Sequence, residues 1–400
     1  MSERSYMYSV SYCAAVSGID GCLIQVEADV SNGLPAFSLV GFLSSEVKEA
    51  RERVQIGIKN AGFLFPPKKI TINLSPANIK KGGTCYDLAI AVSVLTAFGY
   101  ISQTYIKDIL FIGELSLDGK IKEISGVLPR VYTAYENGLS WCVVPKGNEK
   151  EAEIVEGMHV IGVESFSELA ELLKAESLKK VKKRGESLSF PKEESGLDFT
   201  DVYGQRTVKR AAMIAAAGRH HLLMIGPPGS GKTMIAKRIP DILPQMTWEE
   251  KMEISKIYSV AGLLSKEHPL VEKRPFRAPH HTVTTQALAG GGHIPKPGEI
   301  SLASGGILFL DEFAEFKRQT IEALRQPLEE GYVSIARTEG SYRYPARCQL
   351  VAATNPCRCG FYPDRRKCTC SERQIRSYLD KISGPILDRM DLCVETQPLV

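Results

Sequence analysis

Apolar and polar positions follow two different periods in the first part of the chain. Residues 22–30 (CLIQVEADV) alternate in part between apolar and polar, which is typical of a half-buried strand. Residues 46–62 (EVKEARERVQIGIKNAG) repeat apolar side chains at the helical spacing and end on a glycine. Residues 68–76 (KKITINLSP) predict a strand that a proline ends, and residues 86–100 predict a buried helix. The pattern therefore predicts a domain that mixes helices and strands.

The composition changes after residue 173. The next stretch is rich in charge, has only scattered apolar residues and contains Gly185 and Pro191. We predict a linker over 174–197 whose Lys/Arg run is solvated, and a loose electrostatic contact with nucleic acid is the alternative. The predicted domains are accordingly 1–173 and an α/β domain at 198–400.

Composition adds limits to this organisation. Four hundred residues exceed one ordinary core, which agrees with two domains. The net charge of +4 is too small to indicate a nucleic-acid partner by itself. No apolar run reaches the roughly 18 residues of a membrane span, and the N-terminus lacks the pattern of a signal peptide. The sequence thus predicts a cytoplasmic protein without a membrane partner.

Residues 226–233 (GPPGSGKT) match the phosphate-binding loop pattern G-x-x-x-x-G-K-[ST] at every position. A strand-like run precedes them and a helix-like run follows, as the pattern requires. Lys232 would supply charge to the β- and γ-phosphates, and the Thr233 hydroxyl would reach Mg²⁺. The predicted ATP–Mg²⁺ site comprises Gly226, Pro227, Pro228, Gly229, Ser230, Gly231, Lys232 and Thr233.

Two further predicted strands end in polar residues that suit this chemistry. Residues 305–312 (GGILFLDE) end in Asp311, which would hold the Mg²⁺ shell, and Glu312, which would polarise the attacking water. The alternative is a buried strand with acids at its solvent end, but the phosphate loop upstream favours the catalytic interpretation. Residues 349–356 (QLVAATNP) place Asn355 at a third strand end, where it could orient the same water.

Arg389 lies between two acids in residues 383–392 (SGPILDRMDL). We predict an arginine finger that stabilises charge in the nucleotide site of a neighbouring subunit, a group worth roughly 10³–10⁵ in rate. The alternative is a surface salt bridge, usually worth under about 1 kcal/mol.

The segments DVYGQRTVKRAAMIAAAGRHHLLMIGPPGSGKT, RPFRAPHHT, ILFLDE and TNPCRCG together resemble the magnesium-chelatase-like branch of AAA+ ATPases, and more narrowly the bacterial ComM/YifB family. The resemblance covers nearly the whole chain. It implies a P-loop AAA+ αβα core with a parallel sheet, a homohexamer, and Tyr203 and Gly204 near the adenine. It also implies a helical lid after the Arg389 segment. Because the sequence ends at Val400, where the lid would begin, we expect a core without this lid and less efficient hydrolysis.

The same resemblance implies two elements that contact DNA, an insertion at 282–300 and a hairpin at 333–347 of the kind that lines the pore of related hexameric helicases. Members of the family are associated with DNA branch migration during natural transformation. The residues alone also predict the hairpin, because VSIAR and YRYPAR flank a polar TEGS turn.

Basic and aromatic side chains of the hairpin suit a nucleic-acid contact. We expect Arg337 and Arg343 near its tip to hold phosphate, with Tyr342 and Tyr344 stacking on bases. Lys296 in the insertion is a second candidate for the same role. The alternative is a plain surface hairpin.

Residues 113–152 resemble the proteolytic domain of Lon, which implies a Lon-like α+β fold for the first domain. A Lon-type site needs a serine nucleophile and a lysine. Here Thr84 and Cys85 stand near the nucleophile position, and Pro129 and Arg130 stand where the lysine is needed. Proline offers no base and arginine stays protonated, so we predict an inactive domain that serves as a scaffold for assembly or substrate engagement.

Two C-x-C pairs lie in the loop after Asn355, and four thiolates this close could form a tetrahedral zinc site. The spacing is tighter than the usual C-x₂-C, and free thiols or a redox-labile loop are the alternatives. The four residues are Cys357, Cys359, Cys368 and Cys370.

Two histidine pairs, His220–His221 and His280–His281, also raise the question of a metal. Adjacent residues on a strand point to opposite faces, so we predict structural roles for both pairs.

The sequence as a whole predicts an ATP-hydrolysing hexameric motor that moves on branched or single-stranded DNA, with ATP and Mg²⁺ as cofactors and a structural Zn²⁺. The alternative is an AAA+ protein-remodelling or chelatase-type assembly factor that does not act on DNA. Arg337 and Arg343 discriminate between the two, because only the first function needs them.

Overall fold

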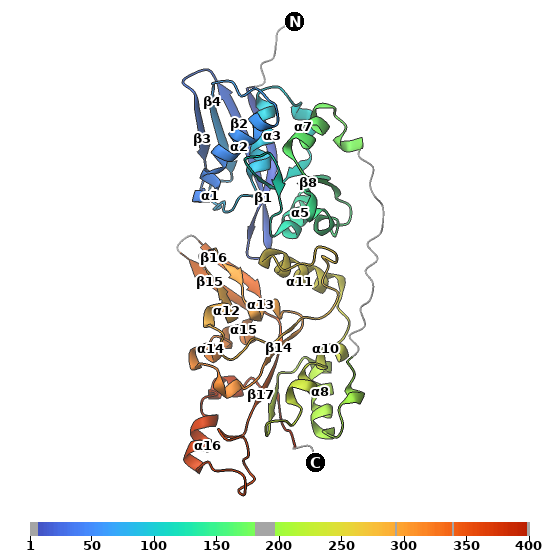
Figure 1. The fold of residues 1–400 in the computed structure, drawn as a ribbon, viewed down its shortest axis with the longest axis vertical. Coiled ribbons are helices and arrows are strands. Elements are labelled where there is room, and N and C mark those ends of the chain that lie inside the picture. Colours follow the sequence, from blue (N-terminus) through green and yellow to red (C-terminus); the bar gives the residue numbers. More distant parts are fainter. Residues whose placement is uncertain (1–6, 181–196, 293, 338–339, 398–400) are drawn as a thin grey trace. The chain divides into compact units, whose positions relative to one another are not determined.

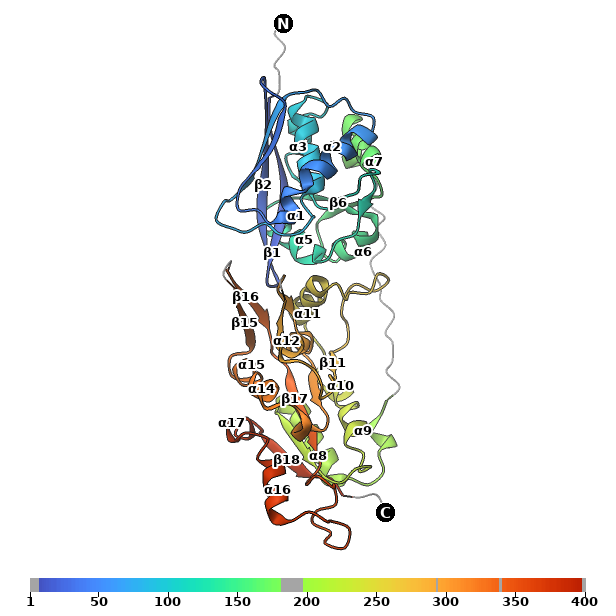
Figure 2. The same ribbon diagram turned by 60° about the vertical axis from the view of Figure 1, so that its left-hand side comes forward.

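The computed structural model describes residues 7–180, 197–292, 294–337 and 340–397 (Figures 1 and 2). These residues form two compact units. The first contains 7–180 and 258–270, and the second contains 197–257 and 271–397. Residues 258–270, which the sequence placed in the ATPase domain, thus group with the first unit. Most of the predicted linker at 174–197 lies outside the described residues.

A seven-stranded mixed sheet forms the centre of the first unit, in the order β3-β4-β2-β1-β5-β8-β9. β2 pairs antiparallel with both β1 and β4, and the remaining pairs in the sheet are parallel. The strands are β1 (Tyr8–Ser17), β2 (Asp20–Ser31), β3 (Ala36–Val40), β4 (Lys69–Ser75), β5 (Ile109–Phe111), β8 (Trp141–Pro145) and β9 (His159–Val163), with a separate hairpin of β6 (Glu114–Leu115) and β7 (Ile121–Lys122).

Helix α3 (Asp87–Ala97) is buried along its whole length, because it is apolar on nearly all sides and packs on β1 and β2. Helix α2 (Ala50–Asn60) lies on α3, and the two appear together beside the sheet in Figure 2. The helix predicted over 46–62 is broken at Glu49. The other helices of this unit are α1 (Ser45–Lys48), α4 (Gln103–Ile106), α5 (Val127–Glu136), α6 (Glu149–Ala152) and α7 (Phe166–Lys174), with 3₁₀ turns η1 (Lys146–Asn148) and η2 (Leu178–Lys180).

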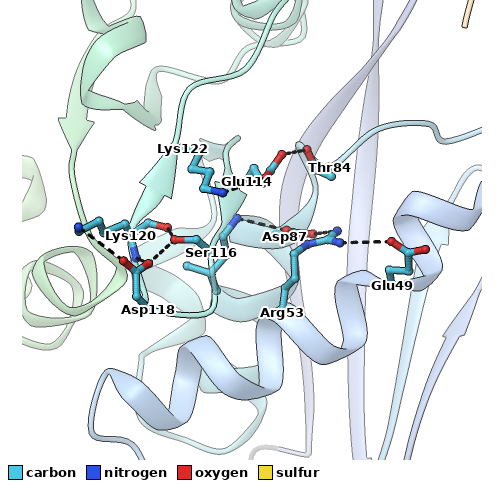
Figure 3. Close-up of polar contacts among 10 residues, drawn as sticks. Glu49, Arg53, Thr84, Asp87, Glu114, Ser116, Asp118, Lys120 and Lys122 are labelled. Carbon is cyan, nitrogen blue, oxygen red and sulfur yellow. Dashed lines mark hydrogen bonds and ion pairs between the residues drawn. The ribbon is translucent and has the colours of Figure 1, made fainter.

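A buried ion pair joins these helices (Figure 3). Asp87, at the first turn of α3, is only 1% exposed and accepts hydrogen bonds from Arg53 Nε at 2.6 Å and Arg53 Nη2 at 3.0 Å. The backbone N–H of Leu115 donates to the same carboxylate at 3.2 Å. One carboxylate therefore ties α2, α3 and β6 together.

A five-stranded sheet forms the second unit, in the order β11-β14-β17-β10-β18, and every pair in it is parallel. All residues of β14 and β17 are buried, as expected for a parallel sheet covered on both faces. The strands are β10 (Leu222–Ile225), β11 (Phe276–Arg277), β14 (Ile307–Leu310), β17 (Gln349–Thr354) and β18 (Leu392–Glu395).

Parallel order fixes where the predicted site residues lie. The carboxyl ends of the strands meet at one edge of the sheet. The phosphate-binding loop follows β10, Asp311 and Glu312 follow β14, and Asn355 follows β17, which lies between those two strands. The predicted α/β class with a parallel P-loop sheet is therefore confirmed.

Among the described residues, no helix has the length and apolar character that spanning a membrane requires.

The remaining elements surround this sheet or extend from it. The helices and turns are η3 (Phe199–Asp201), α8 (Arg206–Gly218), α9 (Lys232–Ala236), α10 (Ile239–Ile242), α11 (Trp248–Ala261), α12 (Thr285–Ala289), α13 (Glu299–Leu302), η4 (Phe313–Glu315), α14 (Arg318–Glu322), α15 (Arg325–Glu330), α16 (Glu372–Leu379) and α17 (Gly384–Leu387), and the two hairpins are β12–β13 (Gly290–Gly291, Lys296–Pro297) and β15–β16 (Tyr332–Arg337, Gly340–Pro345).

We expect Asp87→Ala to lower the stability of the first unit by about 3–5 kcal/mol, because it leaves the Arg53 guanidinium without its buried partner. Urea unfolding can be followed by the fluorescence of Trp141, which stacks on His159, in a Trp248→Phe background that removes the other tryptophan.

The matched control is Glu52→Ala, which removes an exposed partner of Arg51 on the same helix and should cost under about 1 kcal/mol. Equal unfolding midpoints for the two variants would contradict the importance of the buried pair.

Candidate functional site

The phosphate-binding loop leads from β10 into α9, and its conformation depends on glycine. Gly229 and Gly231 adopt left-handed φ angles of 75° and 84°. A Cβ on Gly226 would clash with the Thr396 hydroxyl at the end of β18. Thr396 Oγ1 lies 2.6 Å from Ser230 Oγ, so the neighbouring strand holds the loop from one side.

Lys232 reaches back over the loop. Its Nζ donates to the carbonyls of Gly226 at 2.8 Å and Pro227 at 2.9 Å, and it lies 3.4 Å from Asn355 Oδ1. Burial lowers the pKa of Lys232, and the negative charge of Asp311 partly opposes this shift. Because its hydrogen-bond partners are neutral oxygens, an anionic phosphate oxygen would be a stronger partner for this ammonium.

Thr233 and Asp311 meet beside the lysine. Thr233 Oγ1 donates to Asp311 Oδ2 at 2.6 Å, and the other oxygen of Asp311 accepts the backbone N–H of Glu312 at 2.9 Å. A hydroxyl and a carboxylate supply the oxygen ligands that Mg²⁺ prefers near phosphates. The two residues could hold the ion that neutralises phosphate charge.

Glu312 adopts a left-handed φ of 51°, and its Oε2 lies 3.0 Å from His281 Nδ1. The ring of His281 also lies against that of His280, tilted by 34° with the centroids 4.0 Å apart. The strand assumed for this pair is wrong, because the pair lies in the loop between β11 and α12, and the predicted structural role stays a prediction. His281 is thus a site residue that the sequence reasoning missed.

The segment before α8 is tied to the phosphate loop by Gln205. Gln205 Nε2 donates to the carbonyl of Ser230 at 3.2 Å and to that of Gln397 at 2.6 Å. Tyr203 and Gly204 directly precede it, and Tyr203 is 83% exposed. Their predicted place near the adenine therefore stays a prediction, with Gln205 as an unforeseen link between this segment and the loop.

Arg389 contacts a different part of the unit. Its guanidinium forms an ion pair with Glu329 on α15 and donates to the carbonyl of Pro385 at 2.5 Å. Its Nε is buried and has no hydrogen-bond partner among the described residues. The structure therefore brings together Lys232, Thr233, Asp311, Glu312 and Asn355, while Arg389 makes its own contacts elsewhere.

The two hairpins of the second unit lie against each other. Arg337 is exposed at the end of β15 and donates to the carbonyl of Gly292 at 3.1 Å, in the turn of the hairpin that carries exposed Lys296. Arg343 lies 4.3 Å over the ring of Tyr332 and is also exposed. Three basic side chains thus occupy one pair of hairpins.

Two details of the predicted hairpin were wrong. Arg343 pairs with Ser334 in the middle of the ladder, not near the tip, because the strands extend to Arg337 and Gly340. Tyr344 is only 1% exposed and donates to the carbonyl of Pro295, so it cannot stack on a base. Its hydroxyl instead joins the two hairpins.

The four cysteines after Asn355 converge. Their Sγ atoms all lie within 4.8 Å of one another, and the three pairs among Cys357, Cys359 and Cys368 are 3.4, 3.6 and 3.8 Å apart. Four sulfurs around zinc at about 2.3 Å would be about 3.8 Å apart, so the separations fit a tetrahedral site. Backbone N–H groups of Phe361 and Thr369 lower the pKa of Cys359 to about 6, which favours its thiolate. Against the lowering effect of a backbone N–H on each, desolvation and the neighbouring thiols raise the pKa of Cys370 and raise that of Cys368 to about 11.

The Lon-like region of the first unit has different side chains from those a serine–lysine site needs. Thr84 Oγ1 donates to Glu114, whose other oxygen lies 3.9 Å from Lys122 Nζ (Figure 3). The Arg130 guanidinium donates to the carbonyls of Ala14, Ser125 and Gly126, so it is a structural cation. This arrangement agrees with an inactive protease, which stays a prediction.

A parallel sheet that joins a phosphate-binding lysine, a carboxylate suited to Mg²⁺ and a polar third strand end defines a P-loop ATPase core. Residues 198–400 match the family described as magnesium chelatase, subunit ChlI, and residues 26–148 match that described as subunit ChlI of Mg-chelatase. The chain belongs to the ComM/YifB family of magnesium-chelatase-like AAA+ ATPases, with an N-terminal Lon-protease-like domain.

Relatives of the ComM/YifB type match the chain almost from end to end, and a Lon protease matches part of it. It is 41% identical to the competence protein ComM of Haemophilus influenzae and 40% identical to YifB of Escherichia coli, over 97% of this chain and 76% and 75% of theirs. An uncharacterised protein of Mycobacterium tuberculosis is 43% identical over 97% of this chain and 77% of its own. The Lon protease of Mesomycoplasma hyopneumoniae is 27% identical over 39% of this chain and 19% of its own.

We expect Glu312→Gln to lower the steady-state ATPase rate by about 10²–10⁴-fold while ATP affinity changes little, because the amide keeps the shape but cannot polarise water. Phosphate release and titration with a fluorescent nucleotide measure the two effects. The control is Glu315→Gln, three residues further on and paired with Lys381. Hydrolysis by the Glu312 variant at the control's rate would disprove its role.

We expect His281→Ala to lower kcat by roughly tenfold or more with little change in KM, because Glu312 loses the group that orients its carboxylate. His280→Ala serves as the neighbouring control and should have a smaller effect. If the two variants show the same kcat, His281 does not position Glu312.

Proposed function

We propose that the protein is an ATP-driven motor that works as a ring of six chains on branched or single-stranded DNA, in recombination or natural transformation. The observation that carries this proposal is the set of exposed basic residues on two adjoining hairpins of the ATPase unit, Lys296, Arg337 and Arg343. Such side chains neutralise phosphates, and displacement of counterions from DNA drives the binding. The name of the related competence protein ComM supports a role in DNA uptake.

The nucleotide site supplies the energy in this proposal. Lys232 and the loop N–H groups bind the phosphates, Thr233 and Asp311 hold Mg²⁺, and Tyr203 with Gly204 lies beside the adenine. Glu312 polarises the attacking water, which Asn355 helps to orient. Contacts among the side chains support the roles of Lys232, Asn355, Thr233 and Asp311. The contact with His281 supports the role of Glu312, and the place of Tyr203 and Gly204 rests on the family resemblance alone.

A neighbouring subunit completes the site in the same proposal. Among the described residues, Arg389 makes no hydrogen bond or ion pair with the phosphate loop of its own chain. Its Nε has no hydrogen-bond partner among these residues either. If Arg389 left Glu329 and paired with the phosphates of a nucleotide bound to the next subunit, it would act as an arginine finger. The proposed hexamer therefore rests on the argument that a neighbouring subunit must supply this arginine to complete the nucleotide site.

The other proposed assignments concern the rest of the chain. The four-cysteine loop holds a structural Zn²⁺, which the sulfur separations support. Residues 1–173 form an inactive Lon-like scaffold, 174–197 a linker and 198–400 the ATPase domain, with residues 258–270 grouped with the scaffold. The protein acts in the cytoplasm, where ATP is available.

We expect forked DNA to stimulate the Mg²⁺-dependent ATPase, and Arg337→Ala/Arg343→Ala to lose this stimulation. Because two phosphate contacts are removed, the slope of log K for DNA binding against log salt concentration should become shallower by about 2. The ratio of rates with and without DNA measures the stimulation, and anisotropy of labelled DNA at several salt concentrations gives the slope.

The control variant Arg210→Ala/Arg373→Ala removes the same charge from exposed positions on α8 and α16 and should keep the stimulation. Stimulation that survives in the hairpin variant would disprove the hairpin contact. A wild-type hexamer whose hydrolysis is indifferent to DNA would favour a protein-remodelling factor.

A further inference from the structure

The loop that carries the four cysteines has almost no regular structure of its own. Residues 357–370 connect β17 to α16 through turns, of which Gly360 N–H to Cys357 O at 3.0 Å and Cys368 N–H to Asp364 O at 2.8 Å are examples. Loops of this length without secondary structure are uncommon in compact domains and need something to hold them. Four converging thiols can do so through a metal ion.

Charge also favours a metal in this loop. Zinc with four thiolates carries two net negative charges, and the loop contributes four basic side chains against a single acid. The basic residues are Arg358, Arg365, Arg366 and Lys367, and the acid is Asp364. Neighbouring cations stabilise such an anionic centre.

The same loop lies directly against the phosphate-binding loop. Gly360 adopts a left-handed φ of 85°, and a Cβ added to it would lie 2.8 Å from Pro228 Cδ and 3.3 Å from Pro228 Cγ. The backbone at Gly360 therefore contacts the proline ring without space for a side chain. The cysteine loop also begins close to the phosphate loop. Asn355 lies two residues before Cys357, and its Oδ1 is 3.4 Å from Lys232 Nζ.

We infer that metal held by Cys357, Cys359, Cys368 and Cys370 fixes the cysteine loop against Pro228, so that the metal supports the conformation in which the phosphate-binding loop takes up ATP. The inference rests on the proposed zinc and extends it to control of nucleotide affinity. Loss of the metal frees the cysteine loop, so the contact between Gly360 and Pro228 is no longer held. The phosphate-binding loop then loses more conformational entropy when it binds ATP, which lowers its affinity for the nucleotide.

The first measurement is the metal content of the full chain purified without chelators. We expect about one zinc per chain in the wild type and in Cys393→Ser, which alters an exposed thiol outside the cluster, and less than about a tenth in Cys359→Ser/Cys368→Ser. Less than about a tenth of an equivalent of transition metal in the wild type would overturn the site.

The second measurement is the affinity for a fluorescent ATP analogue with Mg²⁺ and without DNA, so that it is independent of the proposed DNA motor. A zinc-selective chelator should weaken this affinity roughly tenfold, and added zinc should restore it. Restoration on adding zinc separates the effect from irreversible unfolding. Unchanged affinity in protein shown to be free of metal would overturn the inference.

The variant Gly360→Ala tests the contact itself. We expect it to keep about one zinc and to weaken nucleotide binding roughly tenfold, which corresponds to about 1.4 kcal/mol of crowding against Pro228. Gly331→Ala is the matched control, because Gly331 has a φ of 70° but an added Cβ would meet only the flexible Arg347 side chain. Equal affinities for the two variants would show that the contact at Pro228 is not needed.

Discussion

The parallel order of the five-stranded sheet is the constraint on which the site of this protein depends. Parallel strands bring their carboxyl ends to one edge, so loops that are far apart in the chain become neighbours there. Lys232 follows β10, Asp311 and Glu312 follow β14, and Asn355 follows the strand between them. Its central strands β14 and β17 are buried on both faces, which makes them a rigid base for these polar side chains.

Residues outside the phosphate-loop and acidic-strand motifs hold the reactive groups at this edge of the sheet. Thr396 and Gln205 hold the phosphate loop through Ser230, and His281 holds Glu312. The cysteine loop adds a contact from a further direction, through Gly360. A site made of loops needs such neighbours, because loops are otherwise the least rigid parts of a fold.

The two units differ in how they use polar burial. In the ATPase unit, buried Lys232 lies beside neutral carbonyls and is suited to an anionic ligand, whereas in the Lon-like unit the buried Asp87 carboxylate is paired with the Arg53 guanidinium. Satisfied buried charges stabilise a fold, and a buried cation without an anionic partner is suited to binding one. This contrast agrees with chemistry in the second unit and a scaffold in the first.

The sequence by itself determined the α/β class, the phosphate loop, the acidic strand end and the hairpin, because each depends on local spacing or on turn residues next to one another. It misjudged what depends on distant packing. Tyr344 was expected on the surface but is buried against the second hairpin, and the loop at His280–His281 was mistaken for a strand. The pairing of His281 with Glu312 and the contact of Gly360 with Pro228 were decided by the tertiary structure alone, because each joins segments whose separation in sequence says nothing about their distance in space.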